Sequence, residues 1–211
     1  MALTLWHTAQ THCATFDRLC DRIAPGLELR HVVRPEWLAR SQGGVPADVA
    51  AEIASAAGQA EGPVLCTCTT IGPVAETVGA LRVDWPMMQA AARLEGAILV
   101  AYALDSTRDV SLALLDRALE QEARHAEVRP LPLTQFWPLF EAGERMAFDA
   151  SIAAGIREAA RRVPGLGCVV LAQVSMAGAA PLLDDLAVPV LSAPDPGVAG
   201  GGGNVNCRFL I

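Results

Sequence analysis

The sequence lacks any apolar run of the roughly 18 residues that a membrane-spanning helix needs. Its first ten residues, MALTLWHTAQ, also lack the basic region with which a secretion signal begins. Aromatic residues are scarce at 5%, although the chain is 52% hydrophobic, so alanine, leucine and valine supply most of the apolar content. We therefore expect a soluble cytoplasmic protein with closely packed helices and strands.

The sequence also has no excess of positive charge. The 16 basic residues are outnumbered by 23 acidic ones, which gives a net charge of −7. Nucleic acids and anionic membranes bind proteins largely through clustered positive charge. The composition therefore predicts no nucleic-acid partner and no membrane partner.

The six cysteines show no regular framework. They lie at positions 13, 20, 66, 68, 168 and 207 and have no secretory context, so we expect reduced thiols. A structural zinc site needs four ligands with recognisable spacing. No second closely spaced cysteine pair and no HxxxH pattern occurs, and the four histidines are scattered. The sequence therefore predicts no metal site.

Short β-rich apolar runs alternate with amphipathic segments along the chain, which is typical of βαβ units and parallel sheets. We predict helices over Thr11–Ile23, Pro46–Ala57, Val110–Ala123 and Met146–Arg162. We predict strands over Ala2–Thr8, Leu27–Val33, Pro63–Cys68, Ala97–Leu104, Ala126–Leu131, Cys168–Gln173 and Val188–Ser192.

The order of these elements suggests an internal repeat. Three β-α units fill residues 2–95 and three more fill 97–187, and the nonapeptides VLCTCTTIG (64–72) and VLAQVSMAG (170–178) follow corresponding strands. We predict an α/β fold of two pseudo-symmetric lobes, each with a mostly parallel sheet flanked by helices. The first lobe is 1–95 plus 188–211 and the second is 96–187. Because parallel sheets bind ligands at the carboxyl ends of their strands, we expect an active-site cleft between the lobes.

Cys66 and Cys68 permit several interpretations. Buried cysteine is usually a small apolar residue. A disulfide between them is geometrically poor, because alternate strand residues lie about 6–7 Å apart. Cysteine at a strand-to-helix junction meets amide groups that favour the thiolate. Strand alternation makes Cys68 the exposed thiol and Cys66 the core residue, and the pattern leaves catalysis and a structural thiol open.

At this point the chain resembles the aspartate/glutamate/hydantoin racemase superfamily, which includes arylmalonate decarboxylase and maleate isomerase. The resemblance covers most of the chain. Cys68-Thr69-Thr70 matches a Cys-Asn-Thr type motif with threonine for asparagine. The second motif of hydantoin-racemase-like members, Leu-Gly-Cys-Ala-Gly-Met-Ala, corresponds to Leu-Ala-Gln-Val-Ser-Met-Ala at residues 171–177.

The resemblance implies a cofactor-independent enzyme that acts on a small carboxylic acid or amino-acid-like substrate. Cys68 would be the acid/base thiol at the carbon α to a carboxylate, and Gln173 and Ser175 would complete the catalytic set. Substrate-holding groups would be Thr8, Thr69, Thr70, Thr107, Ser175 and Met176. Thr8 and Thr107 are assigned from loop position alone.

The second motif departs from the family pattern. Its cysteine is replaced by Gln173, or by Val174 if the two nonapeptides are aligned without a gap. Two-base racemisation then lacks a second thiol, and Ser175 is a poor base without a His or Lys partner. A one-cysteine decarboxylase or isomerase remains, and so do two rivals. One is a non-catalytic protein that binds or senses a small carboxylate, and the other is a redox protein that uses Cys66 and Cys68.

The segment PLTQFWPLF (132–140) is apolar and aromatic. Such a surface suits a homodimer, while a core or lid position for Phe136, Trp137 and Phe140 explains the same residues. The run Gly200–Gly203 has no strand-then-helix context and predicts a loop.

Overall fold

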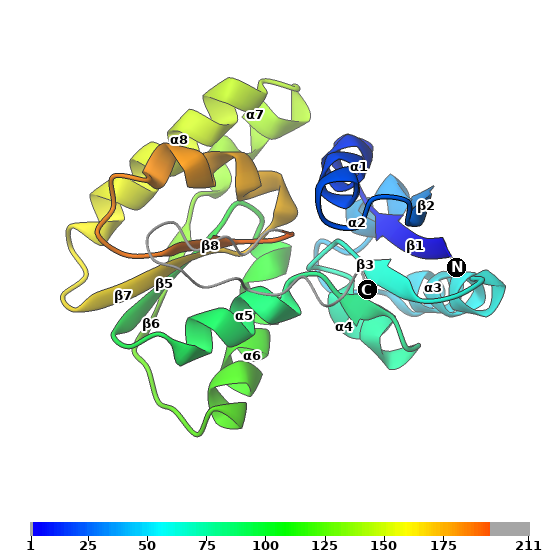
Figure 1. Cartoon of the computed structure of the whole chain (residues 1–211), viewed down its shortest axis with the longest axis horizontal. Helices are drawn as coiled ribbons and strands as arrows, with labels where there is room; N and C mark the ends of the chain where they lie inside the picture. Colours follow the sequence, from blue (N-terminus) through cyan, green and yellow to red (C-terminus); the bar gives the residue numbers. More distant parts are fainter. Residues whose placement is uncertain (1, 195–211) are drawn as a thin grey trace. The chain divides into compact units, whose positions relative to one another are not determined.

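The computed structural model describes residues 2–194. These residues form two compact units, 2–83 and 84–194 (Figure 1). Cys207, the glycine run and the part of the predicted first lobe beyond residue 194 lie outside the described residues.

The first unit is built on a four-stranded parallel sheet with the order β2-β1-β3-β4. The central strand β1 is buried along its whole length, as expected for a parallel strand covered on both faces. The strands are β1 (Ala2–His7), β2 (Glu28–Val33), β3 (Val64–Cys66) and β4 (Leu81–Arg82), and the helices are α1 (Thr11–Ile23), α2 (Pro35–Ala39), α3 (Ala47–Gln59) and α4 (Gly72–Thr77).

Helices α1 and α3 cover opposite faces of this sheet. Neighbouring residues of a strand point to opposite faces. Trp6 belongs to an apolar cluster with Val49 and Ile53 of α3, whereas the ring of the next residue, His7, lies 5.4 Å from that of Phe16 on α1. Alternation along β1 therefore decides which side chains meet which helix.

The second unit repeats the arrangement, with a parallel sheet of order β6-β5-β7-β8. Its strands are β5 (Ala97–Tyr102), β6 (Val128–Pro132), β7 (Leu166–Leu171) and β8 (Val190–Ser192). The α-helices are α5 (Trp85–Arg93), α6 (Asp105–Gln121), α7 (Trp137–Glu141) and α8 (Arg145–Ala160), with 3-10 segments η1 (Thr134–Phe136) and η2 (Val174–Leu183).

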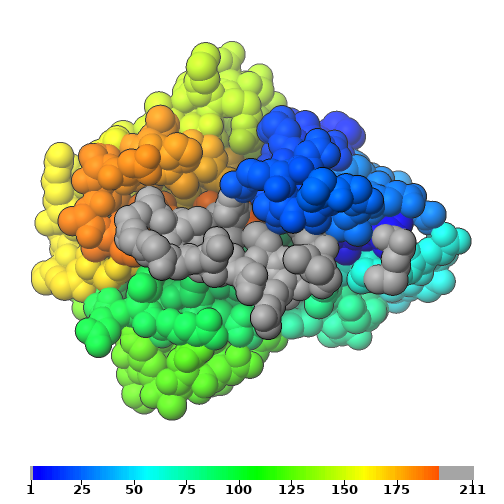
Figure 2. All heavy atoms as spheres, in the orientation of Figure 1, coloured from blue at the N-terminus to red at the C-terminus, as the bar shows by residue number. Residues whose placement is uncertain are grey.

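One face of the second sheet is covered by α8 and η2, which pack side by side and share an apolar core with β5 and β7. Figure 2 shows them as the adjoining yellow and orange surfaces of this unit. The aromatic segment belongs to the same layer, because Phe136, Trp137 and Phe140 pack against this core. The Trp137 and Phe140 rings stack with centroids 4.6 Å apart.

The predicted α/β fold with two parallel sheets is confirmed. The boundaries of the units differ from the predicted ones at two places. Residues 84–95, which contain α5, and residues 188–194, which contain β8, lie in the second unit, where β8 pairs with β7. The two-residue strand β4, which the sequence does not signal, occupies the matching place in the first sheet.

Among the described residues, none of the helices combines the length and the apolar character that crossing a membrane requires.

Candidate functional site

The first candidate site is the turn that leads from β3 into α4. Strand β3 ends at Cys66, and the N–H of Thr67 still donates to the carbonyl of Trp6 on the neighbouring strand. Residues 67–70 then form the turn, and α4 begins at Gly72. A Cβ at Gly72 would lie only 2.9 Å from Nε of Arg82, so glycine lets the turn pack against this side chain.

Cys68 does not emerge into solvent from this turn. Only 8% of its surface is exposed, and its side chain belongs to the apolar cluster that includes Ile71 and Ala75. The prediction of an exposed thiol at Cys68 is therefore wrong. Cys66 is 2% exposed, in the core as predicted, and its Sγ lies 3.4 Å from the carbonyl oxygen of Cys68. All five cysteines of residues 2–194 are thiols rather than disulfides.

The predicted substrate-holding threonines of this unit are buried as well. Thr69 and Thr70 lie in the turn after β3, and Thr8 follows the adjacent strand β1. A buried guanidinium that sequence reasoning missed, that of Arg82, packs against the same turn. The turn thus combines one thiol, several hydroxyls and a buried guanidinium.

The corresponding turn of the second unit is organised by Gln173. Its Oε1 accepts hydrogen bonds from the backbone N–H groups of Ala103 (2.6 Å) and Leu104 (3.1 Å), and it lies 3.4 Å from Oγ1 of Thr107. Its Nε2 lies 3.4 Å from Oγ of Ser175. The structure therefore brings Thr107, Gln173 and Ser175 together, with Gln173 tying the end of β5 to the end of β7.

Two neighbours complete this second turn. Met176 is fully buried in the core of the unit, so it presents no accessible surface to a ligand. Arg145 at the start of α8 donates from Nη2 to the carbonyl of Ser175 (3.2 Å) and stacks 4.5 Å over the ring of Phe140. Its Nη1 is buried without a hydrogen-bond partner, as is Oδ1 of Asp149 one helical turn further along. Nothing in the sequence pattern singles out this cation.

The hydrogen-bond register of the two sheets identifies equivalent positions. Thr67 N donates to Trp6 O in the first unit, and Ala172 N donates to Ala101 O in the second. Trp6 and Ala101 are each the penultimate residue of the central strand. Thr67 is therefore equivalent to Ala172, which makes Cys68 equivalent to Gln173 and decides against the alternative alignment with Val174.

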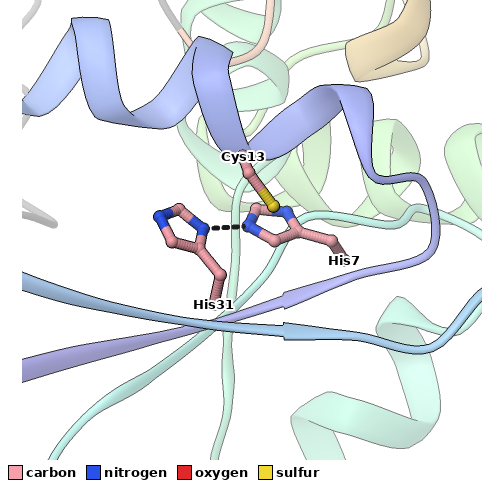
Figure 3. A group of neighbouring side chains, drawn as sticks. All are labelled: His7, Cys13 and His31. Carbon is pink, nitrogen blue, oxygen red and sulfur yellow. Dashed lines mark hydrogen bonds between the residues drawn. The ribbon is translucent and has the colours of Figure 1, made fainter.

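A third group of polar side chains lies in the first unit, and sequence reasoning missed it. His7 Nε2 lies 2.8 Å from His31 Nδ1, and the outer nitrogens of the two rings are also occupied. His7 Nδ1 lies 2.8 Å from Oγ1 of Thr67, while His31 Nε2 lies 2.9 Å from Oδ1 of Asp17. Figure 3 shows Cys13 pointing from α1 toward these rings. A series of hydrogen bonds thus runs from Asp17 through the two histidines to Thr67, the residue that precedes Cys68.

Burial sets the protonation of several of these groups. Desolvation is the largest cause that lowers the pKa of His7, to about 3, and the neighbouring His12 and His31 add to it, so His7 is neutral at physiological pH. Burial also raises the pKa of Cys13, with the Asp17 carboxylate acting in the same direction. Cys168, inside the second sheet, has its pKa raised by burial to about 12 and is an inert core thiol.

A cavity of about 520 Å³ lies elsewhere in the second unit, between the end of α6 and the start of β6. Its lining includes Asp116, Glu120 and Arg124. It lies at the amino ends of the strands and does not coincide with either turn.

Comparison with solved structures gives matches along most of the chain. Glutamate racemase from Francisella tularensis, solved in complex with D-glutamate, matches with a TM-score of 0.68 and 12% identity over 92% of this chain and 75% of that one. Allantoin racemase from Klebsiella pneumoniae matches with a TM-score of 0.59 and 16% identity over 90% of this chain and 82% of that one. A double mutant of arylmalonate decarboxylase in its liganded form matches with a TM-score of 0.57 and 16% identity over 96% of this chain and 94% of that one.

The chain has the racemase fold. No protein-family model and no curated protein matches the sequence. The racemase fold is thus recognised from the structure, at identities too low to carry over a substrate or a set of catalytic residues.

Proposed function

We propose that the protein is a cofactor-independent enzyme of the racemase type, in which the Cys68 thiol exchanges a proton with the carbon α to a carboxylate of a small acid. The observation that carries the proposal is the position of Cys68. It lies in the strand-to-helix turn of a racemase-like sheet, and this turn also carries Thr69 and Thr70 and packs against the buried Arg82. Hydroxyls, backbone amides and a guanidinium stabilise a carboxylate and the enolate that develops from it.

The equivalent position of the second unit supports this assignment. There, two backbone N–H groups at the end of the central strand donate to the side-chain oxygen of Gln173. The position therefore suits a hydrogen-bond acceptor, and a thiolate at Cys68 is one.

Gln173 favours a one-thiol reaction over two-base racemisation. A carboxamide neither donates nor removes a proton at neutral pH, and its oxygen is already held by backbone donors. Decarboxylation of a malonate-type acid fits one thiol. Loss of carbon dioxide leaves an enolate, the Cys68 thiol protonates the α-carbon, and the thiolate then recovers a proton from water.

The test is α-proton exchange in heavy water, followed by proton NMR. The fold suggests a first panel of glutamate, aspartate and an arylmalonate, which are carboxylic acids that its structural relatives are named for. We expect exchange or decarboxylation of one member, reduced about 10²–10⁴-fold in Cys68→Ser, as is typical when a general acid or base is removed. Cys66→Ala, at the end of β3 and two residues before Cys68, is the matched control and keeps the activity. Equal rates in Cys68→Ser and wild type would sink the proposal.

A second candidate is a protein that binds or senses a small carboxylate without turnover. The observation that favours it is the fixed Gln173, which removes one of the two thiols that racemisation uses. Calorimetric titration with the same acids separates the candidates, because a sensor binds one of them while no α-proton is exchanged.

A further inference from the structure

Three metal-binding side chains converge in the first unit from three different elements. His7 stands at the end of β1, His31 on β2 and Cys13 on α1, and Figure 3 shows all three pointing toward one another. One donor atom from each lies within 4.8 Å of the other two. Sequence spacing does not reveal this group, because 24 residues separate the two histidines.

The outer nitrogens of both imidazoles already have the partners that metal-bound histidines use. His31 Nε2 lies 2.9 Å from the Asp17 carboxylate, and His7 Nδ1 lies 2.8 Å from the Thr67 hydroxyl. A histidine that binds a metal almost always donates its other N–H to such a group, which fixes the ring and its tautomer. The inner nitrogens, His7 Nε2 and His31 Nδ1, face each other at 2.8 Å.

The donor set selects the kind of cation. Two imidazole nitrogens and one thiolate suit zinc, whereas magnesium and calcium prefer oxygen ligands. Tetrahedral zinc with ordinary bond lengths places its nitrogen ligands about 3.3 Å apart and nitrogen and sulfur about 3.6 Å apart. To bind zinc, the two inner nitrogens must therefore move apart by a few tenths of an ångström. Cys13 Sγ, which lies within 4.8 Å of a nitrogen of each ring, must move closer to both rings.

We propose that His7 Nε2, His31 Nδ1 and Cys13 Sγ bind one zinc ion, with water as the fourth ligand. Both inner nitrogens then donate their lone pairs to the zinc ion. The His7 proton moves to Nδ1 and is donated to Thr67, whose hydroxyl is 2.9 Å from the carbonyl oxygen of Trp6 and can donate to it. The Cys13 thiol loses its proton to solvent as the zinc–sulfur bond forms, so one proton is released for each ion bound.

The site can be reached from the surface of the unit. Cys13 is partly exposed, 20% of the His31 side chain is accessible, and Asp17 is more exposed still. The fourth position is open to water or to a small anion, which is the coordination of catalytic rather than structural zinc sites. The proposal is independent of the chemistry of Cys68, since neither Cys66 nor Cys68 is among the ligands.

The experiment uses the full chain, freed of metal with a chelator and titrated with cobalt(II) as a spectroscopic probe for zinc. We expect one equivalent to bind and to give the near-ultraviolet thiolate-to-cobalt charge-transfer band, which zinc then abolishes by displacing cobalt. Cys13→Ser should lose the band. Cys20→Ser, a buried cysteine seven residues along the same helix, is the matched control and should keep it.

His31→Gln provides a second variant, so that the result does not depend on how well Cys13→Ser folds. Loss of tight cobalt binding in folded His31→Gln supports the site. The proposal is overturned if wild type binds no cobalt through sulfur, or if the band survives unchanged in Cys13→Ser. It is overturned equally if Cys20→Ser loses the band while Cys13→Ser keeps it.

Discussion

The two units repeat one sheet, yet they carry different chemistry at the same positions. Both sheets have the strand order second, first, third, fourth, all parallel. At the turn after the third strand, the first unit has Cys68 and the second has Gln173. At the positions of His7 and His31, the register of the second sheet places Tyr102 and Pro130.

The difference shows that the repeated fold carries different side chains at equivalent positions. In the second unit, Gln173 joins two strand ends through buried hydrogen bonds. In the first, the same place holds a thiol beside buried hydroxyls, and a histidine cluster lies next to it. We therefore propose that the reactive groups lie in the first unit and that the equivalent turn of the second has a scaffolding role.

The largest effect is expected when the difference between the turns is removed. Cys68→Gln gives the first turn the residue of the second, and turnover or α-proton exchange should fall by about 10²–10⁴-fold because the acid/base group is lost. Circular dichroism checks that the variant is folded. A folded Cys68→Gln protein with wild-type exchange would mean that the two turns do not differ in the way proposed.

Truncation of the Gln173 side chain tests its scaffolding role. Gln173→Ala leaves the buried N–H group of Ala103 and the partly buried N–H group of Leu104 without their acceptor. An unsatisfied buried donor is costly, so we expect the free energy of unfolding to fall by about 2–3 kcal/mol in denaturant titrations. Gln59→Ala, at an exposed position at the end of α3, is the control and should change it by less than about 0.5 kcal/mol. Similar values for the two variants would remove the structural explanation for Gln173.

The histidine cluster provides a third difference between the units. Asp17→Asn weakens the partner that orients His31, and loss of such an outer partner typically lowers metal affinity about 10–100-fold. Competition with a chromophoric chelator measures the affinity. Asp21→Asn, one turn along the same helix, is the control and should bind zinc like the wild type. Equal affinities in the two variants would exclude Asp17 from the site.

The smallest effect concerns Asp149, which packs near the second turn. Burial raises its pKa above the ordinary value of 3.8, although the Arg145 charge opposes this. Its contribution to stability is therefore fully present below pH 3.8 and is lost as the pH rises through the raised pKa. We expect the stability of Asp149→Asn relative to wild type to increase from acidic to neutral pH. Denaturant titrations of both proteins across this pH range measure the trend, and a constant difference would contradict it.

Much of the fold follows from pattern alone. The buried apolar runs of β1 and β5 and the amphipathic stretch of α1 appear in the sequence with the period of their structures. The two-residue strand β4 is too short to produce a pattern, and β8 was predicted as a strand but assigned to the first lobe. Strand pairing is a long-range property, and local sequence does not state which sheet a terminal strand joins.

The candidate sites were only partly accessible to sequence reasoning. The grouping of Thr107, Gln173 and Ser175 follows from the rule that parallel strands end at one edge. The burial of Cys68 does not, because alternation fixes the side of a strand but not what packs over the following turn. The His7, Cys13 and His31 group was missed because its members meet only when α1 is laid across β1 and β2.

The most direct test of the account is the configuration of the α-deuterated product that the wild-type protein forms in heavy water. One thiol, with a carboxamide at the equivalent position, delivers deuterium to a single face of the α-carbon. We therefore predict one configuration in large excess, measured by chiral chromatography with mass detection during the first turnovers. Equal amounts of both configurations from the start would contradict the account, because they would require a second proton donor that Gln173 cannot be.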